Sequence, residues 1–151
     1  MKKFIFSLEK VLDVKKIEEK TIQKQLLYIQ AKIYEVEKSI LLLIEKTSME
    51  REKVSSLKDQ KNSSHDIMVI YKYIESLAVE KEQLYLDLDN LKVTESTVRN
   101  KLVEKSKERK ALEKLKDNKF DEYKRENKKD QQIIYDEIAI TNHRLKHGAT
   151  S

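Results

Sequence analysis

The sequence contains no proline, no cysteine and no tryptophan, and its single glycine among 151 residues is Gly148. An average protein contains about 7 % glycine and 5 % proline. These two residues interrupt helices and supply the backbone angles of tight turns. Their near absence predicts long, uninterrupted helices. The lack of cysteine excludes disulfides and thiolate metal sites, and is typical of a protein from a reducing compartment.

Long hydrophobic runs are also missing. No segment approaches the roughly 18 consecutive apolar residues of a membrane span. The apolar stretch near the start meets Glu9 and Lys10 too early for the core of a signal peptide. We therefore expect a cytoplasmic protein. Charged residues make up 39 % of the chain, yet the net charge is only +5, so both signs are mixed along it.

The pattern of a catalytic or metal-binding site is not found. His65, His143 and His147 lie at a turn and near the end of the sequence, without the spacing of histidines and carboxylates that a metal site requires. There is no glycine-rich loop for a phosphate group. We predict no enzymatic activity, no cofactor, no metal and no small-molecule ligand. The basic stretch 101–129 is interleaved with acidic residues, which favours an ion-paired helix face over nucleic-acid binding.

Apolar residues recur at alternating spacings of three and four in two long segments, the pattern of a coiled coil. Toward the N-terminus this seam contains Lys15 and Glu19, so we expect looser packing there. The seam residues of the two segments are Ile5, Leu8, Leu12, Ile22, Leu26, Ile29, Ile33, Val36, Ile40, Leu43, Val54 and Leu57, then Ile67, Ile70, Ile74, Leu77, Leu84, Leu88, Leu91, Val98 and Leu102.

Turn-forming residues separate the two segments, from Lys58 to Asp66. Asn62 can adopt the left-handed conformation, and Ser63 is a suitable N-cap. The sequence predicts an all-α fold, a long antiparallel two-helix coiled-coil hairpin with unequal arms. We expect one domain over residues 1–151, with a first helix over about 5–60, a turn at about 61–64, and a second helix over about 64–145 whose C-terminal tail overhangs. A single unbroken rod is the structural alternative.

Two further features suggest contacts with other macromolecules. Tyr71 and Tyr73 flank the seam of the second helix, where they either cover its edge or anchor a partner. The run from Ile40 to Ile44 places apolar side chains all round the first helix, more than one seam requires. The amphipathic tail after residue 120 is either a docking element or a solvated helix.

Several motifs resemble those of one known family. The segment from Phe4 to Leu12 is similar to the opening Phe-x-Phe-x-Leu-x-x-Val-Leu of the FliJ family, from the bacterial flagellar type III export apparatus. The aromatic-then-leucine segment Tyr73–Leu77 and the Asp-Glu-x-Ala stretch Asp136–Ala139 also resemble that family. The stalk protein of a virulence type III secretion system, a structural coiled coil unrelated to export, and a nucleic-acid-binding hairpin remain alternatives.

The resemblance implies a non-enzymatic protein that couples the export ATPase ring to the membrane export gate and escorts the chaperones of exported substrates. Its implied partners are the export ATPase and its regulator, the gate protein FlhA, and substrate chaperones, at the cytoplasmic face of the inner membrane. Glu80 departs from the small residue that the family's gate-binding stripe has at this position. The implied gate-binding residues are Tyr73, Leu77, Leu84 and Leu43, and the implied ATPase-ring residues are Phe4, Phe6, Leu8, Leu12, Ile134 and Ile138.

Overall fold

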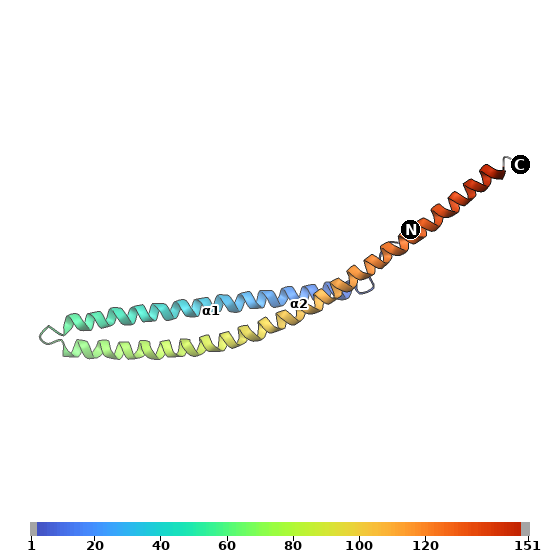
Figure 1. Ribbon diagram of the computed structural model, residues 1–151. Helices are drawn as coiled ribbons and strands as arrows, with labels where there is room; N and C mark the ends of the chain where they lie inside the picture. Colours follow the sequence, from blue (N-terminus) through green and yellow to red (C-terminus); the bar gives the residue numbers. More distant parts are fainter. Residues whose placement is uncertain (1–2, 149–151) are drawn as a thin grey trace. The chain divides into compact units, whose positions relative to one another are not determined.

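The computed structural model describes residues 3–148 and contains two long helices in this range, with no strand. Helix α1 spans Glu9–Leu57 and helix α2 spans Ser64–Gly148 (Figure 1). The prediction of an all-α helical hairpin with unequal arms is confirmed. Residues 1–2 and 149–151, which belong to the predicted domain, lie outside the described part of the chain.

The first compact unit comprises residues 19–104, where α1 and α2 lie side by side on either side of the turn (Figure 1). The heptad pattern dictates which side chains they bury. Partly buried aliphatic residues, among them Leu26 and Leu84, pack against the core of this unit. Its core consists of Ile29, Ile33, Ile40, Leu88 and Val98. All five are seam positions predicted from the three-and-four spacing, so the periodicity places the core correctly.

The turn between the helices contains a left-handed residue. Asn62 has a φ of 66°, as its type predicts, and it takes the place that glycine often has at such reversals. The backbone carbonyl of Ser63 accepts the first helical bond of α2, from the Ile67 N–H at 2.9 Å. The Ser63 hydroxyl donates to the backbone carbonyl oxygens of Leu57, at 2.7 Å, and of Gln60, at 2.9 Å. Ser63 therefore starts α2 and also satisfies carbonyls at the end of α1.

The second compact unit comprises the chain up to Glu18 together with the chain from Lys105 onward. Helix α1 begins at Glu9, so the helix start expected near residue 5 is wrong by about one turn. The segment before it is not helical, and this changes which side chain is buried. Ile5, expected in the seam, is 82 % exposed, whereas Phe6 is 8 % exposed. Leu12, one turn into the helix, is 1 % exposed.

The C-terminal part of α2 after Tyr123 exposes its apolar residues. Every large hydrophobic side chain between Lys124 and Gly148 is half or more exposed, among them Ile133, Ile134, Ile138 and Ile140. We call residues 124–148 the tail. It remains helical to the last described residue.

Candidate interaction surfaces

Four charged side chains from the two helices form a closed ring in the unit that contains the chain ends. The Lys15 Nζ lies 3.0 Å from the Glu108 Oε2 and 3.5 Å from the Glu18 Oε2. The Lys105 Nζ completes the ring, 3.1 Å from Glu18 Oε2 and 3.5 Å from Glu108 Oε2. Signs alternate around this charge ring, so each charge has two opposite neighbours. Lys15 interrupts the apolar seam as expected, but it is paired rather than loose.

Close contacts within the charge ring shift the ionisation of its members. The close contact with Lys105 lowers the pKa of Glu18, and the contact with Lys15 lowers the pKa of Glu108. The contact with Glu108 raises the pKa of Lys15. These shifts hold all three groups in their charged forms, because an opposite charge close by favours the charged form.

An aromatic cluster holds the segment before α1 against α2. The Phe4 ring packs edge-to-face on Phe120 at a centroid distance of 5.1 Å, and lies 5.5 Å from Tyr123. The Lys124 ammonium stands over the Phe120 ring, 4.5 Å from its centroid. We call these residues the aromatic clasp. Aromatic pairs at such separations attract beyond their buried area, so the clasp holds the non-helical segment against α2.

The predicted ATPase-ring residues fall into two environments. Phe4 is half-buried in the aromatic clasp, Leu8 is half-buried, and Phe6 and Leu12 are buried in the hairpin. Ile134 and Ile138, in the tail, are 54 % and 50 % exposed. The tail residues therefore present apolar surface to a partner, whereas Phe6 and Leu12 chiefly hold the two helices together.

The predicted gate-binding residues likewise separate by burial. Tyr73 is 44 % exposed on the surface of α2. Leu77 and Leu43 are 3 % and 5 % exposed, because both occupy seam positions, and Leu84 is half-buried in the same seam. Tyr73 is thus the member of the set that a partner can reach without opening the hairpin. The three leucines support the helix that presents it.

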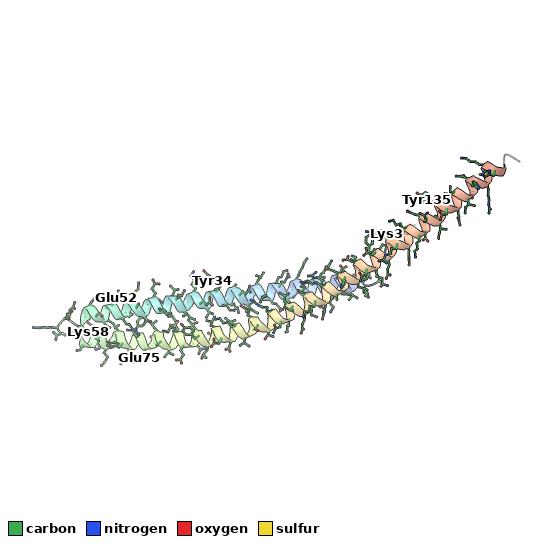
Figure 2. All side chains as sticks on the ribbon, in the orientation of Figure 1. Lys3, Tyr34, Glu52, Lys58, Glu75 and Tyr135 are labelled. Atoms are coloured by element: carbon green, nitrogen blue, oxygen red, sulfur yellow. The ribbon has the colours of Figure 1, made fainter. Side chains whose placement is uncertain are left out.

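Other aromatic side chains project from the helices. Tyr34 on α1 and Tyr135 on the tail extend outward from their helix surfaces, with 67 % and 66 % of their areas exposed (Figure 2). At the end of α2 the rings of His143 and His147 contact each other at a centroid distance of 4.2 Å. Among residues 3–148, no group of three or more metal-ligating side chains is assembled. Neither α1 nor α2 contains a stretch apolar and long enough to cross a membrane.

The comparison with protein families agrees with the motifs at both ends of the hairpin. The family model described as "Flagellar FliJ protein" matches residues 4–148. The chain belongs to the FliJ family. It is therefore a coiled-coil protein related to flagellar type III export, and the FliJ family is a non-catalytic component of export. Neither a curated protein nor a solved structure gives a significant match.

Sequence reasoning missed two features of this FliJ-family chain. The first is the clasp of Phe4 with Phe120 and Tyr123, which no local pattern in the sequence indicates. The cross-helix pair between Glu9 and Lys116 was also missed. The Lys116 Nζ lies 2.9 Å from Oε1 and 2.8 Å from Oε2 of the Glu9 carboxylate. This contact raises the pKa of Lys116.

Proposed function

We propose that this protein links the export ATPase ring to the export gate protein FlhA and escorts the chaperones of export substrates. The observation that supports this best is the FliJ-family match over residues 4–148 of a two-helix hairpin. The chain offers different chemistry in its two units. One carries the exposed Tyr73, and the other carries the aromatic clasp and the apolar tail. Such a division suits a protein that contacts two partners.

For the gate, we assign the contact to Tyr73. Tyrosine combines a large apolar ring with a polar tip and is enriched at the energetic centres of interfaces. Leu77 and Leu84 hold α2 in the hairpin seam and act on the gate only by positioning Tyr73. FlhA lies in the membrane, so this contact places the protein peripherally at the cytoplasmic face.

For the ATPase ring and its regulator, we assign the paired chain ends and the tail. Ile134 and Ile138 are one helical turn apart, so they share a face of α2. Both are at least half exposed. A helix with such a stripe and no intramolecular cover can pack into an apolar groove of a partner.

The gate assignment is tested by measuring FlhA binding to the purified full-length protein and to two tyrosine variants. Tyr73→Ala is expected to weaken binding by about 2 kcal/mol or more, roughly 30-fold. Tyr71→Ala is the matched control, since Tyr71 is 46 % exposed but flanks the other side of the seam. Equal affinities of the two variants would refute the assignment, whether or not the family's role is correct.

The ATPase assignment is tested with a pair of double variants in the tail. Ile134→Ser with Ile138→Ser should lower the amount of the export ATPase captured by the protein, while FlhA binding stays unchanged. Ile133→Ser with Ile140→Ser is the control, because these residues are equally exposed but lie off the Ile134–Ile138 face. Loss of ATPase capture in the control alone would show that another face of the tail binds.

A further inference from the structure

Helix α1 carries a second apolar stripe that the hairpin does not use. Leu27, Tyr34 and Leu41 are spaced seven residues apart, and Ile44 follows three residues later. Their exposures are 65 %, 67 %, 66 % and 43 %. Residues at spacings of seven and three fall on one line along a helix. We call these four residues the outer stripe. It lies wholly within the unit of residues 19–104.

The outer stripe lies on the side of the hairpin opposite Tyr73. A shallow cleft between the helices is lined by Lys32 and Glu35 of α1 and by Asp87 and Asn90 of α2, so these residues mark one flank of the hairpin. Tyr73 precedes Asp87 by two heptads and belongs to the same flank. On α1, Leu41 and Ile44 each directly follow a seam position. They therefore lie on the other side of the seam from Lys32 and Glu35, which places the outer stripe on the opposite flank.

Acidic side chains border the Leu41–Ile44 half of the outer stripe, whereas Lys24 lies about one turn before Leu27 at its other end. Glu37 lies within it, between Tyr34 and Leu41, and Glu45 borders its end. On α2, Glu75 and Glu82 each directly follow a seam position, at Ile74 and Lys81, which turns them toward the same flank as the stripe. Lys38 also borders the stripe, but the balance of charge around its Leu41–Ile44 half is negative.

We propose that the outer stripe binds an amphipathic helix of a protein partner whose own apolar residues repeat at heptad spacing and are flanked by lysine or arginine. The spacing of the stripe matches a helix, since only a helical partner places apolar groups at this repeat over such a length. The acidic border of the Leu41–Ile44 half selects a basic partner there through charge complementarity. Because Tyr73 lies on the other flank, this site and the proposed gate site can be occupied together.

The probe is a synthetic helical peptide of about 21 residues, three heptads, with leucine at its seam positions and lysine beside them. Its affinity for the full-length protein is measured by fluorescence anisotropy at low and high salt. A peptide with glutamate in place of each lysine is the control. We expect the lysine peptide to bind about tenfold or more tightly at low salt, and the difference to shrink as salt screens the charges. No binding, or equal affinity for the two peptides, would overturn the proposal.

Two single variants locate the site. Leu41→Ser is expected to weaken binding of the lysine peptide by about tenfold. Leu42→Ser is the matched control, since Leu42 is 49 % exposed and lies toward the flank of Tyr73. Both residues are outside the seam, so circular dichroism should show unchanged helicity. A greater loss with Leu42→Ser would overturn the placement of the site.

A second copy of this chain is the competing occupant, and sedimentation of the full-length protein distinguishes it. If the outer stripe binds a basic helix, Leu41→Ser should not reduce any self-association of the protein. Self-association lost in Leu41→Ser and kept in Leu42→Ser would assign the stripe to a dimer and overturn the basic-helix partner. Tyr73→Ala should leave the affinity for the lysine peptide within about twofold of that of the unmodified protein. A failed peptide test can therefore be told apart from a failed gate assignment.

Discussion

Truncating Leu12 should open one unit of the hairpin without unfolding the other. Its side chain is 1 % exposed, the only large one below 2 % among the described residues. Replacing a fully buried leucine by alanine typically costs about 2–5 kcal/mol, because apolar contact is lost and a cavity remains. The next seam position toward the turn is Lys15, whose charge is held in the ring with Glu108. That charged neighbour cannot refill an apolar cavity without leaving its partners.

The loss should appear locally. The seam between Leu12 and Ile22 carries Lys15 and Glu19, so this stretch has few apolar seam residues of its own. Local opening then sets the exchange rate of backbone amides in the first turns of α1. A loss of 2 kcal/mol corresponds to exchange roughly 30-fold faster. Hydrogen–deuterium exchange with mass spectrometry should detect this over residues 9–18, with residues 29–54 little changed.

Two variants control for the loss of side-chain volume and for helix propensity. Leu27→Ala makes the same chemical change at a site that is 65 % exposed, and should alter stability by less than about 0.5 kcal/mol. Leu12→Met keeps the volume and should recover most of the protection. If residues 29–54 exchange faster by as much as residues 9–18 in Leu12→Ala, the two units unfold together and the reasoning is refuted.

Two other properties follow from the turn and from the charge ring. Asn62→Ala should lower the free energy of unfolding by about 1–2 kcal/mol in urea titrations, since alanine is strained at a φ of 66°. Asn62→Gly should lower it little, and equal losses in the two variants would contradict the conformational explanation. Because the pKa values of Glu18 and Glu108 are lowered in the fold, their contribution is complete above the ordinary glutamate pKa of about 4.3. It is then lost as pH falls through the lower folded values. Thermal melting followed between pH 6 and about 2 should show a smaller decline in the double variant Glu18→Gln with Glu108→Gln.

The hairpin could be predicted from the sequence because the patterns that indicate it are local and repeated. The three-and-four spacing that predicts the seam is the spacing of the residues found buried, such as Ile33, Leu77 and Leu88. The absence of proline and of internal glycine leaves one cluster of turn formers, so the reversal could be placed at Asn62. Each of these inferences depends on neighbours within one or two helical turns.

The start of α1 could not be predicted in this way. Ile5 continues the heptad phase, so local reasoning extends the helix to it. In the structure the segment is not helical, Phe6 is buried, and Phe4 reaches Phe120. That gain comes from aromatic rings more than a hundred residues apart in the sequence. A pattern of neighbouring residues carries no information about a contact between residues so far apart in the sequence.

For the candidate site, a motif match and a burial pattern gave different information. The family motif selects Tyr73 and Leu77 alike, since both fit the aligned residues. The heptad separates them, because Leu77 is a seam position and Tyr73 is not, and the structure agrees with 3 % and 44 % exposure. Contact with a partner therefore had to be judged from the flank on which a side chain lies, and this needs the register of both helices.

The charge ring specifies that register more strictly than the aliphatic seam does. In a seam of isoleucine and leucine, sliding one helix by a heptad exchanges one aliphatic side chain for another and costs little. In the ring, a slide by seven residues places Lys15 opposite Lys101 in one direction and opposite Leu115 in the other. The first meets a like charge, and the second removes the partner of a half-buried charge. Buried or half-buried polar groups set register in coiled coils by this penalty on the alternatives. Lys15 thus gives up apolar burial at its own position and, together with the short turn between the helices, favours the pairing that brings Phe4 to Phe120.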